Sequence, residues 1–340
     1  MNKFFNKFLF VSATSLLISC GDTSTSTTDI GNVLAADTIS EVSDSIADDS
    51  STTSLLQEFK PQAFSVSGNC SATDGVVTVS RTFSGSQTLE LETTKLEISS
   101  AVTETGTLSR VWDHPTETLA CSGSKASVNF ANDTVVNGLT VTQTVDRERS
   151  ATRTITHKTT GISKTKTNSS TVEGTRTVIW ATGSGEASGV VTRLKSITSN
   201  IDRTATITKK DETNETFTVN VATKEGSPLS VEVLRSATSP YAATQKTIKS
   251  GVVVSTKTGS QKIESSFDDV VYDVDGSNPC LPTSGSITVS TFIPETATTA
   301  SSVYTITFGE DTDSTVAISK DGATAEDFAE FDAKGCDLEK

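Results

Sequence analysis

Alternation of apolar and polar residues is the dominant pattern of this chain from about Gln62 onward. In residues 217–221 apolar side chains stand at every second position, which is typical of a β-strand with one wet face. Residues 76–81 and 286–290 follow the same pattern. Further runs predict strands over residues 89–98, 139–147, 151–157, 175–180, 190–197, 204–209, 252–258, 263–274 and 303–308.

Turn-forming residues separate these runs, and long helical periods are missing from the sequence. We therefore expect an all-β fold: a large antiparallel meander sheet, extended or rolled into an open half-barrel, with few or no helices. One helix is predicted over residues 324–331, where Thr324 is a candidate N-cap. The same residues are also compatible with an edge strand.

The N-terminus has a different pattern. Lys3 and Lys7 precede an apolar run of about ten residues, which is too short for a membrane span of roughly twenty. The run ends at Leu17-Ile18-Ser19-Cys20, which resembles the lipobox of bacterial lipoproteins. The resemblance implies that residues 1–19 are a cleaved signal peptide and that Cys20 is acylated, with palmitate among the acyl groups. A plain secretory signal fits less well, because small residues do not occupy both cleavage positions.

Gly21 follows the cysteine in place of the Asp that resembles an inner-membrane retention signal, so we expect the outer membrane. Residues 20–60 are rich in Ser, Thr and acids, and no basic residue lies between Asp22 and Phe59. Such a segment buries too little surface to order itself, and we expect a disordered tether with a reach of roughly 35 Å. The β-sheet domain then occupies residues 61–279, and a C-terminal β unit that continues the sheet occupies residues 280–340.

Four cysteines remain after Cys20, an even number that suits an exported protein with disulfides. Three pairings are open. We prefer Cys70–Cys121 with Cys280–Cys336, because each bridge closes a local unit. Residues 280–289 and 304–309 resemble the closing hairpin of uncharacterised β-rich bacterial lipoproteins, and this resemblance implies architecture only.

Charge is unevenly distributed along the chain, although the total is −14. Residues 140–262 carry 18 basic and 10 acidic side chains, whereas residues 263–340 carry 3 and 16. The cations often stand two apart, as in Arg147/Arg149, Lys164/Lys166 and Arg193/Lys195, and we favour a solvated strand face that resists aggregation. The alternative is an anionic envelope partner such as lipid A. The negative total argues against nucleic acid.

Two further patterns suggest ligand binding. Threonines alternate at 140, 142 and 144, at 152, 154 and 156, and at 204, 206 and 208, which resembles ice-binding faces but suits any half-wet sheet. Acids cluster at Asp268, Asp269, Asp273 and Asp275, and again at residues 310–313. They lack the remaining ligands of a calcium loop, so turn acids are the favoured interpretation and no metal site is predicted.

Catalytic signals are weak. His114 and His157 are the only histidines, we expect His157 to face solvent, and Ser122/Lys125 form an S-x-x-K of a kind that chance supplies. We predict no enzyme, no catalytic residue and no cofactor.

The favoured function is a structural or interaction role, such as adhesion or surface display, for a lipoprotein anchored in the bacterial envelope. The alternative is a carrier of lipid or another hydrophobic ligand on a concave sheet. An open apolar lining that includes Ile207, Phe217, Val219 and Val221 would favour the carrier.

Overall fold

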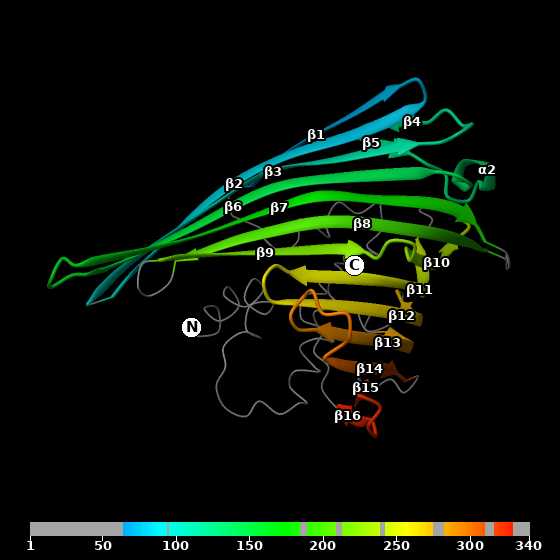
Figure 1. The fold of residues 1–340 in the computed structure, drawn as a ribbon. Helices are drawn as coiled ribbons and strands as arrows, with labels where there is room; N and C mark the ends of the chain where they lie inside the picture. Colours follow the sequence, from blue (N-terminus) through cyan, green and yellow to red (C-terminus); the bar gives the residue numbers. More distant parts are fainter. Residues whose placement is uncertain are drawn as a thin grey trace.

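The computed structural model describes residues 64–93, 95–183, 189–208, 213–238, 242–274, 282–309 and 316–328. The fold is all-β, as predicted, and fourteen strands form one antiparallel sheet (Figure 1). Cys20, the predicted tether and the predicted Cys280–Cys336 bridge lie outside the described residues.

The strands of the large sheet follow one another almost as a meander, interrupted by a two-stranded sheet and a short helix. Their bounds are β1 Phe64–Thr73, β2 Val76–Glu92, β3 Leu96–Asp113, β6 Thr140–His157, β7 Ser163–Thr182, β8 Val190–Thr208, β9 Asn214–Thr223, β10 Leu229–Ser236, β11 Ala243–Lys257, β12 Gln261–Asp273, β13 Pro282–Phe292, β14 Ser302–Phe308, β15 Val316–Lys320 and β16 Glu326–Phe328. The insertion after β3 holds β4 Ala120–Ser122, β5 Lys125–Ser127 and α2 Asp133–Val136.

One place departs from the meander: β9 and β10 lie end to end between the same two neighbours. Both pair with β8 and with β11, so β11 changes partner along its length. Gly251 stands at the change with φ +132°, and a Cβ there would lie 2.6 Å from the Pro228 carbonyl oxygen. A glycine is therefore required where the three strands meet.

The sheet has two chemically different faces, which the printed sequence and the strand register define. Directly paired residues point to the same side of a sheet, so each cross-strand row belongs to one face. We call inner the face that carries the buried row Val77, Trp112, Val141, Val178, Ile197 and Leu229, and outer the opposite face.

The inner face holds one continuous hydrophobic core, which extends from β2 to β15. Fully buried pairs continue it on the later strands: Ile248 of β11 pairs with Val270 of β12, and Ile287 of β13 pairs with Ile306 of β14. Leu119, Phe130 and Val136 of the insertion after β3 complete this core.

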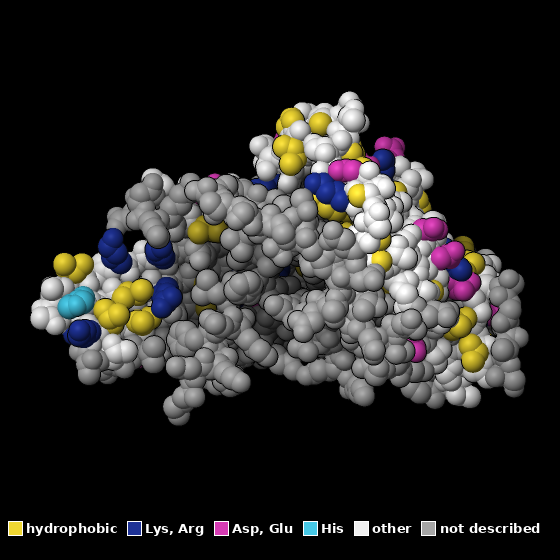
Figure 2. Space-filling view, turned by 90° about the horizontal axis from the view of Figure 1, so that it is seen from below, with side chains coloured by type: hydrophobic (Ala, Val, Ile, Leu, Met, Phe, Trp, Pro, Cys, Tyr) yellow, Lys and Arg dark blue, Asp and Glu magenta, His cyan; other side chains and the backbone are white. Residues whose placement is uncertain are grey.

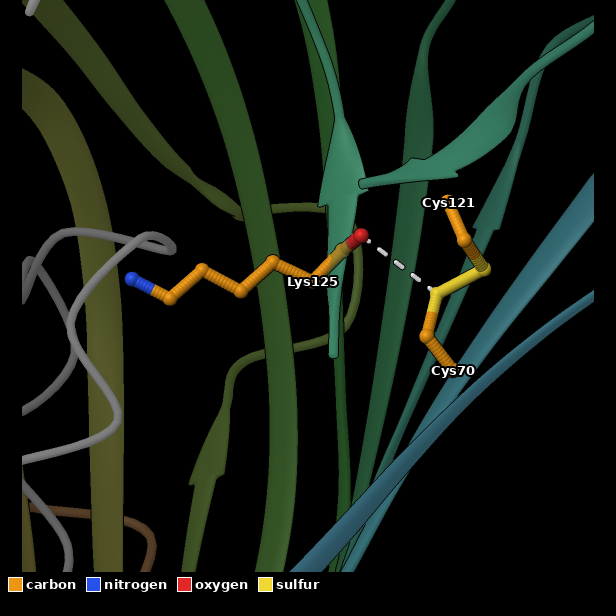
Figure 3. Close-up of a disulfide and its surroundings, with 3 residues drawn as sticks. All are labelled: Cys70, Cys121 and Lys125. Carbon is orange, nitrogen blue, oxygen red and sulfur yellow. Dashed lines mark hydrogen bonds between the residues drawn. A yellow bond between two sulfur atoms is a disulfide. The ribbon is translucent and has the colours of Figure 1, made fainter. Parts of the chain in front are cut away.

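The insertion after β3 is fastened to the sheet by a disulfide and a buried histidine. Cys70 of β1 and Cys121 of β4 are bonded, which is the pairing preferred from the sequence, and the Cys70 sulfur lies 3.4 Å from the Lys125 carbonyl oxygen (Figure 3). His114 Nδ1 accepts hydrogen bonds from the Glu117 and Thr116 amides, and Nε2 donates to the Asn137 carbonyl at 3.0 Å. His114 is thus a structural residue.

Several predicted strand boundaries are wrong because the strands are unusually long. Residues 139–147 and 151–157 belong to the single strand β6, and β8 likewise joins two predicted runs. Residues 89–98 are two strands, because the Thr93 side chain accepts a bond from the Leu96 amide at 2.9 Å and closes a turn. The predicted helix over 324–331 is also wrong at residues 326–328, which form the edge strand β16.

A cationic inner face as the candidate functional site

The inner face carries most of the basic side chains of the central strands. In the register these cations share the face of the core rows, from β2 to β11. They are Arg81, Arg110, Arg147, Arg149, Arg153, Lys164, Lys166, Arg176, Arg193, Lys195, Arg203, Arg235, Lys246 and Lys257. In the described part of strands β1 to β12, the acids on the same face are Glu104 and Glu215.

Two of these arginines lie deep in the fold, next to the core. Arg110 of β3 and Arg176 of β7 flank Gln143 of β6 in one cross-strand row, and all three are at most 8% exposed. Burying guanidinium groups is costly unless hydrogen bonds or anions compensate for the lost water. This row therefore places buried positive charge on the inner face.

Two inner-face rows farther along, beyond the buried row of Leu108 and Val145, the cations become partly accessible. Arg147 Nε lies 2.8 Å from Glu104 Oε1, with side chains 12% and 2% exposed. Arg203 of β8 stands in the same row as Arg147, and Arg149 of β6 stands in the next row. On β2 of the same face, burial lowers the pKa of Arg81 below its ordinary value.

Strands β2, β3, β6 and β7 continue beyond the core as a long arm, at the left of Figure 1. We define the arm as residues 83–93, 95–106, 147–172, 203–208 and 213–219, and the arm face as its inner face. Apolar side chains are interspersed with its cations: Val172 lies between Arg147 and Arg203 in one row, and Ala205 pairs with Phe217 in the next.

Phe217 illustrates the mixed character of the arm face. Its ring lies 4.9 Å from Lys257 Nζ, and its side chain is only half-buried. Ile207 and Val219 are also half-buried, whereas Val221, nearer the core, is buried. Of the apolar lining predicted from the sequence, the part on the arm is therefore partly open and the rest belongs to the core.

At the opposite end of the sheet, cations and aromatic rings form a closed cluster. Lys195 Nζ lies 4.3 Å from the Trp180 ring centroid, and Arg235 lies over the Phe130 ring at 4.7 Å. Arg193 is fully buried; its Nε donates to the Phe130 carbonyl at 2.7 Å, and it forms an ion pair with Asp133 at 2.8 Å. This cluster holds the segment around α2 against β7 and β8, which is a structural task.

The prediction that paired cations form a solvated strand face is therefore wrong for Arg193 and Lys195, which are 0% and 2% exposed. Both are buried because they lie on the inner face of β8, and the insertion that supplies Phe130 and α2 covers this part of β8. Lys164 and Lys166 are exposed, as predicted. The sequence located the basic strands correctly, but we did not predict that their cations lie on one face. The sequence does contain this information, because the cations occupy the same alternate positions as the core residues.

The predicted threonine ladders lie on the outer face of β6 to β9. The side chain of Thr208 is not among those that the structure describes. Their hydroxyls bond across the strands, with Thr154–Thr165 and Thr206–Thr216 both at 3.0 Å. A depression of about 290 Å³ on this face is lined by Thr103, Thr105, Ser150, Ser169, Thr171 and Glu148 among others. The outer face is thus wet and internally hydrogen-bonded.

The remaining sequence candidates lie apart from the arginines of the arm face, although His157 is at the far end of the arm. Ser122 and Lys125 pair across the exposed β4–β5 hairpin, and His157 is half-buried near the end of β6 rather than fully solvent-facing. Asp268, Asp269 and Asp273 are exposed on β12, where Asp269 pairs with Lys249 Nζ at 3.0 Å. Asp275 and residues 310–313 lie outside the described residues.

Within the described ranges, His, Cys, Asp and Glu side chains form no group of three or more that suits a metal ion. The helical content of the same ranges includes no segment long and apolar enough to cross a membrane. Comparison with protein-family models, with curated proteins and with solved structures gives no match.

Proposed function

We propose that this protein is a lipid-anchored lipoprotein of the bacterial cell envelope that binds an anionic amphiphile along the arm face. The observation that carries the proposal is the arrangement of Arg147, Arg149 and Arg203 around Val172, Ala205 and Phe217 on one side of the arm. An anionic headgroup suits the first set and a hydrocarbon chain suits the second.

The charge of this face supports an anionic ligand. Glu104 is buried beside Arg147 and neutralises part of the surplus, but Arg149, Arg153 and Arg203 add charge of one sign to the same surface. Guanidinium groups bind phosphate and carboxylate groups through paired hydrogen bonds. Arg110 and Arg176 beneath them add to the positive potential at close range.

The apolar side chains of the arm support a ligand with a hydrocarbon part. Ile207, Phe217 and Val219 are half-buried on β8 and β9, so a bound chain would remove further apolar surface from water. Each buried methylene group of such a chain contributes about 0.8 kcal/mol. The anchor at Cys20 and the acidic tether would hold this surface close to the membrane that supplies the ligand.

A second candidate, the structural or adhesive role, is favoured by the outer face. Its cross-strand hydroxyl pairs, such as Thr154–Thr165, form a broad polar surface that suits contact with a hydrated polymer. The two candidates use opposite faces of the same strands, so variants on one face separate them.

Native mass spectrometry of the protein purified from its host tests the carrier proposal. We expect a bound anionic lipid, and we expect Arg149→Gln combined with Arg203→Gln to reduce its occupancy at least fivefold. Lys125→Gln, an exposed cation on the β4–β5 hairpin, is the matched control and should retain the lipid. Lipid-free protein, or equal occupancy in the double variant with an unchanged circular-dichroism spectrum, would refute the proposal.

A further inference from the structure

The end of the arm forms a compact tip from two turns that are distant in sequence. We define the tip as the described residues 93, 95 and 96 at the β2–β3 turn and residues 157–163 at the β6–β7 turn. The Lys158 amide donates to the Lys95 carbonyl at 3.0 Å, and the His157 amide donates to the Ile162 carbonyl at 2.9 Å. The second bond closes the β6–β7 turn, and the first holds the two turns side by side, so they act as one surface.

Cations gather next to this tip on the inner face. Arg153 of β6 is paired directly with Lys166 of β7, and Lys164 pairs with Ile155 on the same side. Like charges directly opposite in a sheet are destabilising, so this row costs stability in the free protein. Seen from below, Lys, Arg and hydrophobic side chains share the left end of the molecule (Figure 2).

An acidic residue near the start of β3 lies on the outer face. Glu97 pairs with Thr156, and the Thr156 hydroxyl bonds with Ser163 on the outer face at 2.8 Å. The inner side of the tip region is therefore basic, whereas the outer side presents hydroxyls and a carboxylate. This asymmetry gives the end of the arm a definite orientation toward a charged surface.

An apolar side chain completes the surface. Ile162 is 63% exposed at the β6–β7 turn, the highest value among the exposed large hydrophobic residues of the described chain. Ile98 and Ile155 are paired just behind it on the inner face and are half-buried. A bulky apolar residue surrounded by lysines at the end of a protruding ribbon suits the boundary between headgroups and acyl chains.

We propose that the tip docks on an anionic lipid bilayer, with Ile162 entering the headgroup region and Arg153, Lys164 and Lys166 contacting lipid phosphates. Several cations near one anionic surface contribute together, and the attraction weakens as salt screens it. The proposal does not require the arm face to carry a ligand, because Lys164 and Lys166 lie at the far end of that face, beyond the rows of Arg147, Arg149 and Arg203.

Vesicle co-sedimentation of the full chain carrying Cys20→Ser, which removes the predicted acylation, tests the proposal. We expect binding to vesicles of phosphatidylcholine with phosphatidylglycerol, and at least tenfold weaker binding to phosphatidylcholine alone or in high salt. Lys164→Gln with Lys166→Gln should weaken binding to the anionic vesicles about tenfold, and Ile162→Ser should weaken it severalfold. Lys125→Gln removes an exposed cation at the other end of the sheet and should bind as the parent does.

Equal binding to neutral and anionic vesicles, or equal binding by the parent and the tip variants, would overturn the proposal. Concentration-dependent self-association through the tip, seen in the parent and lost in Ile162→Ser without vesicle binding, would assign the surface to a second copy and also overturn it. The arm-face double variant at Arg149 and Arg203 should still bind anionic vesicles. Its behaviour therefore separates a failure of tip docking from a failure of ligand binding.

Discussion

Glu104 and Arg147 form an ion pair on adjacent strands of the inner face, with Oε1 and Nε 2.8 Å apart. They are not directly opposite in the register, because Arg147 pairs with Gly106 and Glu104 pairs with Arg149. Gly106 is required between them, because a Cβ there would lie 2.5 Å from the Phe83 ring and from the Asp146 carbonyl oxygen. Glu104 thus lies between two arginines and is the buried carboxylate of the described strands.

We predict that Glu104→Gln is more destabilising than Arg147→Gln. Removing the carboxylate leaves neighbouring cations on a shielded face, whereas removing one cation lowers an existing surplus. Removing one partner of a buried ion pair and leaving the other charge uncompensated typically costs about 3–5 kcal/mol. We therefore expect Glu104→Gln to lower the free energy of unfolding by about 3 kcal/mol. Urea unfolding followed by circular dichroism measures both values, and equal or reversed losses would contradict this assignment of charge.

Arg193 predicts a second stability effect, at the closed end. Its side chain is fully buried and bonds to the Phe130 carbonyl and to Asp133. Arg193→Lys keeps the charge but loses the planar fork, so we expect a loss of about 2 kcal/mol and faster hydrogen exchange in α2. Asp133→Asn removes the charge of a 58% exposed partner and should cost less. Unchanged exchange in Arg193→Lys would show that this arginine does not hold the insertion.

The Cys70–Cys121 bridge predicts a larger effect on unfolding. It closes a loop with a sequence separation of 51, for which the chain-entropy relation gives about 4 kcal/mol. We expect the double variant Cys70→Ser, Cys121→Ser to lose stability of this order, and the parent to show the same loss in reducing buffer. A parent protein with the same denaturation midpoint with and without reductant would argue that the bridge is absent in solution.

Glu264 gives a pH dependence with a defined sign. Burial alone would raise its pKa, but hydrogen bonds from Lys224 at 2.8 Å and Lys262 at 2.9 Å lower the pKa overall. Because the folded pKa is below the unfolded one, the stabilisation is complete above about pH 4.3 and is lost as the pH falls through the folded value. Glu264→Gln should therefore lower stability by up to about 1 kcal/mol at neutral pH, with the difference from the parent vanishing in acid. A difference that persists at low pH would contradict this origin.

The sequence predicted the class of the fold because alternation directly reports which side chains face the core. Strand boundaries were predicted less well. The arm strands β6 to β8 remain paired through stretches such as 148–150, where apolar residues are too scarce to show alternation. The strand β10 was missed although Leu229, Val231 and Val233 alternate. Its partner β11 follows it directly, but β9 separates it from its other partner β8, and pattern alone does not indicate that pairing.

The candidate site was predictable only in part. An excess of positive charge in the central strands was evident, and so was the apolar alternation around Phe217. Burial of Arg193 and Lys195 depended on the insertion after β3, whose docking involves residues more than fifty positions away. A local pattern of charges two apart is the same for an exposed strand and for one covered by a distant segment.

The connection between β9 and β10 lies inside the sheet rather than at its border. The Lys224 amide donates to the Val252 carbonyl and the Val252 amide to the Ser227 carbonyl, so this loop itself completes the ladder beside β11. Hairpin turns at the margin of a sheet accept added residues readily. Here an inserted peptide would separate β8 from β11 and divide the protein into two half-sheets, so we expect loop grafting or epitope tagging to fail at residues 224–228 and to succeed at exposed turns such as 258–260.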